Sequence, residues 1–526
     1  MTNVSLNPLE LLKDLSYLTS GFLIFEHSLN QQFLYCAFID TKHKTANLSK
    51  PNNKPAATGI YNKPLNSDFI FSLNSGDRTK ICRIATSPSQ IEDLQNYWRG
   101  FKSKLEKLVF NVENKTQIFE QRINLYSEIE NQIEIQRAFL EKEALNANIQ
   151  MNILEIEENY SEIMENLQEY LGPIFEKLGN FFPPGNERNS ASNQKANKET
   201  ISQPGKDSII ILTDEILSVA SLESIPKLKS SISRDFSLQV LHHRLKGMGE
   251  SDPVDAPSTT DIKKKDKSKT PHRLAAFRDI NKKSTKIIPL NRQLPTGSMA
   301  IDTNQMRFLV DPSQDSSNSN SPSLGSFFKN EMTISVLREQ QITPRWVGLV
   351  GDDECPTTCE LELYLKEANS MIYVNTENFI SLFSPQLLLM INANDLQFLC
   401  CFDRMETRKT KERIVQKSSA MSKQDLRSQD STSAAQLISL MGVKSFVFNQ
   451  WAGLIDWNKW EIKTFFSGFL DDGMNVGECL QQIRNPPIEE VPELIKNLSL
   501  TSPSESFIKS NLVLYGLPNI AVSGSV

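Results

Sequence analysis

The strongest constraint on the fold is the alternation of short apolar runs with helical segments in the second half of the chain. The runs have the composition of buried strands and lie at Met306–Val310, Ala368–Val374, Leu396–Cys401 and Ser445–Asn449. Segments with helical spacing lie between them, at Glu331–Gln340, Cys359–Lys366 and Ala434–Met441. This order predicts an α/β sandwich with a mainly parallel sheet, closed by a last strand at Leu512–Gly516.

The N-terminal part has a different pattern. A short helix from Leu9 is expected to lead into a β-hairpin of Phe22–Glu26 and Phe33–Ile39, and runs at Asp68–Ser72 and Lys80–Ile84 extend it to an antiparallel sheet. From Ser87 onward apolar residues recur at three- and four-residue steps, which predicts one or two long amphipathic helices ending near Pro183. These helices either pack within the chain, which the irregular heptads favour, or form a coiled coil with another chain.

Two polar segments divide the chain. Residues 185–206 are expected to be a disordered linker, and residues 246–295 a disordered basic loop with a lysine run at 263–269. Between them, Asp207–Thr213 is typical of a buried strand, followed by a helix through Leu245. The predicted organisation is therefore a strand and helix region (1–112), long helices (113–184), the linker, a first core strand and helix (207–245), the basic loop, and an α/β core (296–526).

Composition excludes several classes of function. The 526 residues carry a net charge of -6, which gives no overall field for nucleic acid, and no apolar stretch is long enough to span a bilayer. The seven scattered cysteines indicate a reducing, cytoplasmic compartment. Cys355 and Cys359 have no second ligand pair for a metal, and nothing indicates a cofactor. The basic loop is either a solvated linker or a contact for an acidic surface such as tubulin tails.

Several short motifs follow one another in a recognisable order. They are Phe308–Pro312, Val350–Glu354, Ser439–Trp451 and Leu514–Pro518. In order and spacing these motifs resemble the CHAT family, the caspase- and separase-like proteases that often follow TPR arrays. The resemblance implies a caspase-like sandwich in which the strands ending at Val374 and Cys401 are adjacent and parallel.

The resemblance also implies where the catalytic residues of active members lie. They place a His-Gly after one parallel strand and a nucleophilic Cys after the next. In this sequence those positions fall on Glu377 and Phe402, with Asp403 retained behind them. A shift of one residue would bring Cys401 to the nucleophile position, so a cysteine endopeptidase remains the alternative. All five histidines precede Met299, however, so the core lacks the base, and we expect no enzyme activity and no catalytic residue.

Loss of catalysis with retention of the scaffold favours a protein-binding role. Among CHAT-like chains without catalysis, the sequence is most similar to the C-terminal region of a large TPR protein of the axonemal central apparatus. The implied role is structural, in the axoneme of a motile cilium or flagellum within the cytoskeleton. The implied partners are TPR-containing and microtubule-associated proteins, with no nucleic acid and no membrane. A cytosolic regulatory pseudoprotease is the other non-catalytic alternative.

Overall fold

The structure is a computed structural model. It describes residues 19–41, 69–72, 79–129, 132–178, 208–246, 299–301, 306–312, 324–328, 347–351, 356–404, 430–486 and 507–522, with gaps at 226–227, 229 and 384. The side chains of 109–150 are not part of this description. The expected helix from Leu9, most of the two polar segments, and the expected helix Glu331–Gln340 lie outside the described residues.

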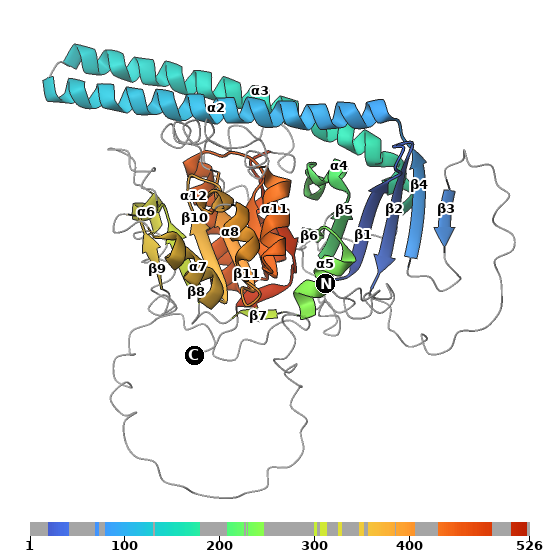
Figure 1. The fold of residues 1–526 in the computed structure, drawn as a ribbon. Coiled ribbons are helices and arrows are strands. Elements are labelled where there is room, and N and C mark those ends of the chain that lie inside the picture. Colours follow the sequence, from blue (N-terminus) through green and yellow to red (C-terminus); the bar gives the residue numbers. More distant parts are fainter. Residues whose placement is uncertain are drawn as a thin grey trace, which may run out of the picture.

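One large sheet runs through the centre of the molecule (Figure 1). Its strands are β1 Gly21–His27, β2 Phe33–Asp40, β3 Phe69–Ser72, β4 Thr79–Ala85, β5 Ser208–Thr213, β6 Ser231–Asp235, β8 Met306–Val310, β9 Val347–Val350, β10 Ser370–Val374, β11 Phe398–Phe402, β12 Ser445–Asn449 and β13 Leu512–Gly516. Their order across this 12-stranded sheet is β3-β4-β2-β1-β5-β6-β13-β12-β11-β10-β8-β9. A separate 2-stranded sheet joins β7 Met299–Ile301 to β14 Ile520–Val522.

The C-terminal half of the large sheet confirms the predicted α/β sandwich. Strands β9, β8, β10, β11 and β12 are parallel to one another, and β13 returns antiparallel to β12. The expected adjacency of two strands is also confirmed, since Ser370 pairs with Phe398 and Val374 with Phe402. Every residue of β10, β11 and β12 is buried, as expected for parallel strands covered on both faces.

The N-terminal half continues the same sheet. The predicted hairpin is confirmed by the antiparallel pairing of β1 with β2, and β4 and β3 extend it as expected. On its other side β1 pairs in parallel with β5, and β5 with β6. Arg234 of β6 then meets Tyr515 of β13, so strands β1–β6 and strands β8–β13 form one continuous sheet. The sequence analysis did not predict β6.

Helices cover both faces of the C-terminal half (Figure 1). Those on one face are α7 Thr358–Glu367, α8 Pro385–Met390 and α11 Ser431–Leu440. The other face is covered by α12 Ile455–Phe466, a π-helical turn at Ser467–Asp472 and α13 Val476–Arg484. The remaining helices are α4 Glu215–Ser218, α5 Leu238–Lys246 and α6 Leu324–Phe327, with 3₁₀ turns at Leu222–Ser224 and Phe379–Leu382. Phe465, Phe466 and Phe469 are at most 1% exposed, so they pack inward.

Several predicted boundaries are wrong for local physical reasons. Helix α11 begins at Ser431, not Ala434, because the Asp430 side chain accepts the amides of Thr432 and Ser433 and caps the helix there. Strand β10 begins at Ser370 because Ala368 is still the C-cap of α7. Strand β11 continues through Phe402. Leu512–Gly516 is a strand as predicted, but β14 follows it, so it is not the last one.

The long helices form a hairpin of α2 Pro88–Ile129 and α3 Gln132–Leu178, which lies across one end of the sheet (Figure 1). An aromatic cluster attaches it to the core. Trp98 stacks on Trp451, with ring centroids 6.4 Å apart, and Tyr160 lies 6.1 Å from the same ring. The core-proximal part of the hairpin therefore packs within the chain, as favoured. None of the described helices is both long enough and apolar enough to cross a bilayer.

Candidate functional site

The candidate site lies where β10, β11 and β12 end. In open α/β sheets, ligands bind outside the carboxyl ends of the parallel strands. The backbone N–H of Asn375, just after β10, donates to the Phe402 carbonyl across 3.1 Å, which ties these two strand ends together. The two family positions, Glu377 and Phe402, are therefore both placed at this end of the sheet by the pairing of β10 with β11.

Glu377 lies in the turn that follows β10. Glu377 is only 4% exposed, and the Ser381 hydroxyl donates to its Oε2 across 3.1 Å. The Tyr373 hydroxyl donates to the Glu377 carbonyl across 3.2 Å. These bonds anchor the turn before the 3₁₀ helix Phe379–Leu382.

Phe402 is the last residue of β11 and is fully buried. Its ring centroid lies 5.9 Å from that of Phe465 and 6.2 Å from that of Phe466, both on α12. A benzyl side chain offers neither a nucleophile nor a proton, and here it fills the space between sheet and helix. Phe402, where the resemblance to CHAT proteases placed the nucleophile, is thus part of the hydrophobic core.

Asp403 connects the ends of three strands. Its Oδ2 accepts the backbone N–H of Phe379 across 3.1 Å, and its carbonyl accepts from Asn449 Nδ2 across 2.9 Å. Asn449 in turn donates to Asn458 Oδ1 across 2.6 Å, which extends the network to α12. Burial raises the pKa of Asp403, although Arg404 and the surrounding amides oppose this shift. These contacts indicate that Asp403 has a structural role in joining the ends of β10, β11 and β12.

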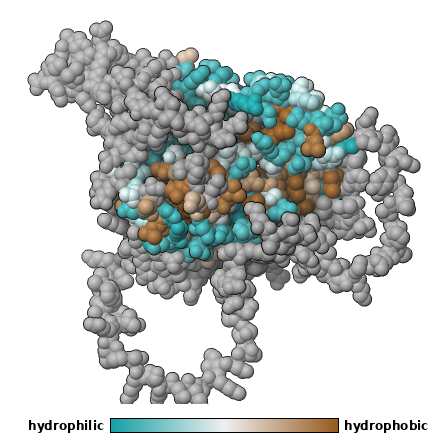
Figure 2. Space-filling view, viewed as in Figure 1, coloured by the Kyte–Doolittle hydropathy of each residue, from teal (hydrophilic) through white to brown (hydrophobic). Residues whose placement is uncertain are grey.

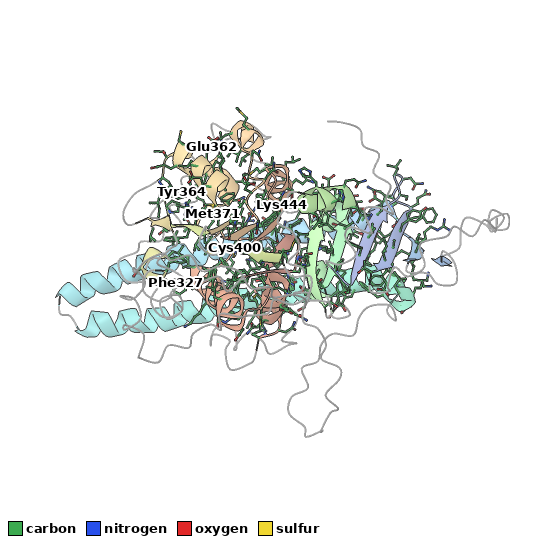
Figure 3. The ribbon with its side chains drawn as sticks, turned by 90° about the horizontal axis from the view of Figure 1, so that it is seen from below. Phe327, Glu362, Tyr364, Met371, Cys400 and Lys444 are labelled. Atoms are coloured by element: carbon green, nitrogen blue, oxygen red, sulfur yellow. The ribbon has the colours of Figure 1, made fainter. Side chains whose placement is uncertain are left out.

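Cys400 and Cys401 point to opposite faces of the sheet, as their adjacent positions in a strand predict. Cys400 packs with the cluster under α12, and Cys401 with the cluster under α7, α8 and α11. Figure 3 places Cys400 deep in the centre of the molecule. Burial raises the pKa of both thiols well above the usual value, and Asp403 raises that of Cys401 further. Neither sulfur is set up as a thiolate nucleophile.

The burial of these thiols predicts their reactivity. In the folded protein, iodoacetamide should alkylate Cys359, which is exposed, and leave Cys400 and Cys401 unmodified until urea unfolds the chain. Peptide mass spectrometry of samples quenched at intervals measures each site. A Cys359→Ser variant is the control that removes the fast reaction. Fast labelling of Cys401 that disappears on unfolding would contradict the geometry, since it would require an activated thiolate.

A second cluster of polar side chains was not predicted. His27 Nδ1 lies 2.5 Å from Asp214 Oδ2, and His27 Nε2 lies 2.6 Å from the Tyr170 hydroxyl. Asp214 also accepts the amide of Leu217 and so caps α4. The arrangement has the order of a catalytic triad, but burial and then the charge of Asp214 raise the pKa of Tyr170, so its phenol is a poor nucleophile.

The cluster therefore joins the ends of β1 and β5 to α3. His27 and Asp214 each directly follow a predicted strand, but only the parallel pairing of β1 with β5 brings them together. That pairing spans more than 180 residues and left no local signal. Within the described residues, no group of three or more His, Cys, Asp or Glu side chains has the arrangement of a metal site.

Comparison with known proteins gives a distant structural likeness. No protein-family model matches the sequence. A chain in the 2.6 Å crystal structure of the Saccharomyces cerevisiae separase-securin complex is similar over 98% of this chain, with a TM-score of 0.46 and 11% identity. The 3.0 Å structure of the same complex gives 97% coverage, a TM-score of 0.46 and 10% identity. In both comparisons this chain spans 31% of the length of the other.

Proposed function

We propose that this chain is a non-catalytic, CHAT-like pseudoprotease that serves as a structural component of the motile-cilium axoneme, in a projection of the central apparatus. Its role there is to hold partner proteins and support ciliary beating. The proposal combines the sequence resemblance to the C-terminal region of cilia- and flagella-associated protein 46 with the chemistry of the candidate site.

The observation that supports loss of catalysis is the filling of both family positions. Glu377 and Phe402 are 4% and 0% exposed, and each is fixed by contacts within the fold. The alternative nucleophile, Cys401, is fully buried and its pKa is raised. An active cysteine endopeptidase would also need a histidine base, and all five histidines precede Met299 in the sequence. A binding role requires none of these groups.

The proposed partners are TPR-containing and microtubule-associated proteins of the same projection. The mixed surface of the described part supports a role in protein contacts. Figure 2 shows apolar patches set among hydrophilic ones across the middle of the face that is seen in Figure 1. The helices of the C-terminal half carry exposed apolar residues. They include Leu363, Met390 and Leu440, which are 49%, 79% and 72% exposed. Polar surroundings with apolar patches are typical of protein-binding surfaces.

The proposal predicts where a tagged copy of the chain is found in a ciliated cell. After detergent removes the membranes, the tagged chain should remain with the isolated axonemes through a moderate salt wash. Loss of the chain should weaken beating while the outer microtubules still assemble. Immunoblotting of the fractions and high-speed video of beating are the two measurements. A chain found only in the soluble extract would exclude the axonemal role and favour the cytosolic pseudoprotease.

The proposed absence of catalysis can be measured separately. The purified chain should not cleave a fluorogenic peptide library, and its preparation should behave identically when Cys400 and Cys401 are each replaced by Ala. Turnover that is present in the original chain and lost in Cys401→Ala would show that the chain is an endopeptidase.

A further inference from the structure

Helix α12 covers the sheet at the candidate site through polar and aromatic contacts. In its first half, Asn458 Oδ1 accepts a hydrogen bond from Asn449 Nδ2, at the end of β12, across 2.6 Å. In its last turn, the ring centroid of Phe465 lies 5.9 Å from that of Phe402 and 6.3 Å from that of Phe398, both on β11. The side of α12 that carries Asn458 and Phe465 therefore faces the sheet.

Glu461 lies on this same side of α12. It follows Asn458 by three residues and precedes Phe465 by four, and residues at these steps share one face of a helix. Glu461 is 1% exposed, and its Oε1 has no hydrogen-bond partner among the described residues. Lys463, on the opposite side of the helix, is exposed. A buried polar atom without a partner is rare in a folded protein and calls for an explanation.

The charges around Glu461 do not compensate it. Helix α12 contacts α6, which is uncharged, as well as α13, the π-helical turn and β11. The charged side chains on α12 itself and on these elements are Lys459, Lys463, Asp472, Glu478, Arg484 and Asp403. None of them lowers the pKa of Glu461, and burial raises that pKa well above its usual value. The buried thiols of Cys400 and Cys479 stay neutral, because burial also raises the pKa of each.

The two protonation states of Glu461 therefore differ in how well they fit the closed structure. The neutral carboxyl group carries an O–H donor and no charge, so burial costs it comparatively little. The carboxylate would be a buried charge with no partner, which is among the most costly groups to keep out of water. That cost is relieved only when the carboxylate reaches water, and this requires α12 to move away from the sheet.

We propose that Glu461 is a proton-dependent latch that holds α12 on the sheet. With the neutral carboxyl group, α12 stays packed on β11 and β12 and covers the strand ends. Ionisation releases the helix and opens this end of the sheet. Since the pKa is higher in the folded than in the unfolded state, the latch contributes stability at low pH that is lost as the pH rises. The latch does not depend on the cellular location of the chain.

Urea unfolding of the full chain and of Glu461→Gln, at several pH values between about 5 and about 7, tests the latch. The unfolding equilibrium constant of the original chain, divided by that of the variant, should rise by about tenfold for each pH unit above about 4.3, until the folded pKa is reached. A constant effect of the buried amide does not change this slope, and other titrating groups cancel in the ratio. Glu165→Gln, at an exposed position of α3, is the matched control and should give no slope.

Hydrogen exchange followed by mass spectrometry locates the opening. As the pH rises, the amides of α12 should lose protection in the original chain relative to Glu461→Gln at the same pH. Helices α7 and α11 lie on the other face of the sheet and should keep their protection.

Two results would overturn the latch. A ratio of unfolding constants that does not change with pH would mean that Glu461 has the same protonation in the folded and unfolded chains. Equal loss of protection in α12, α7 and α11 would mean that ionisation unfolds the whole core and releases no single helix. Glu461→Met, which removes the carboxyl group at similar volume, should repeat the result of Glu461→Gln and serves if the amide prevents folding. Circular dichroism confirms that each variant is folded.

Discussion

Replacing Arg234 with methionine is expected to lower the free energy of unfolding by about 3–5 kcal/mol. Arg234 is 1% exposed, and its guanidinium forms an ion pair with Glu223, which is 7% exposed. It also donates to the carbonyls of Ser218 and Ala220 across 2.7 and 2.6 Å. Removing the cation leaves a buried carboxylate and two carbonyl acceptors without these donors, at the point where β6 meets β13.

The dependence of this loss on pH has a defined sign. Burial opposes ionisation of Glu223, but the charge and hydrogen bonds of Arg234 hold the pKa of Glu223 below its usual value. In the original chain this carboxylate therefore contributes stability above the pKa of the unfolded state, and that stability is lost as the pH falls. Without Arg234, the charge of Arg484 still favours the ionised form of Glu223, but the larger effect of Arg234 is lost, so charging the buried Glu223 costs more as the pH rises. The difference between variant and original should be largest near neutral pH and shrink toward about pH 4.

Two controls separate the buried pair from other effects. Urea unfolding of the double variant Arg234→Met and Glu223→Leu should recover much of the lost stability, because no unpaired carboxylate remains. Arg307→Met breaks a pair with Glu367 that is 3.8 Å long and more exposed, so it should cost no more than about 1 kcal/mol. Equal losses in Arg234→Met and Arg307→Met would contradict the structural importance assigned to the buried pair.

The same residue shows why part of the fold was not predictable from the sequence. Strands β10, β11 and β12 are continuous apolar runs, and their type and order could be predicted because both faces are covered. Strand β6 is Ser-Ile-Ser-Arg-Asp, and every residue of it is buried although only Ile232 is apolar. Its burial depends on Glu223, which lies 11 positions earlier and forms the buried pair with Arg234. Hydrophobic patterning does not contain that information.

Part of the candidate site could likewise be predicted from the sequence, and part could not. The resemblance to CHAT proteases pointed to Glu377 and Phe402, and the strand pattern placed both near the ends of two adjacent strands. The sequence could also place Cys400 and Cys401 on opposite faces from the alternation of a strand. It did not reveal that Phe402 still belongs to β11 and meets Phe465, or that Asp403 joins three strand ends. The contact of Phe402 depends on α12, which begins more than 50 residues further along the chain, and the contacts of Asp403 depend on Phe379 and Asn449.

Replacing Trp451 with alanine is expected to loosen the hairpin from the core and to cost about 3–5 kcal/mol of unfolding free energy. Trp451 is 3% exposed and lies two residues after β12. Its ring contacts Trp98 and Phe101 of α2, with centroids 6.4 and 5.5 Å away, and Tyr160 of α3 at 6.1 Å. Both helices of the hairpin therefore meet the core at this indole.

The loss of stability in Trp451→Ala should be largest at the hairpin, because the Trp451 ring contacts both α2 and α3. Hydrogen exchange should rise around Trp98 and Tyr160 in Trp451→Ala, while the amides of β10 and β11 remain protected at low urea concentration. Trp451→Phe keeps an aromatic ring and should lose less stability. Tyr97→Ala, at a neighbouring residue that is 46% exposed, should change stability by no more than about 0.5 kcal/mol. Unchanged exchange around both Trp98 and Tyr160 would mean that the remaining contacts, including Phe101 with Phe507, hold the hairpin without Trp451.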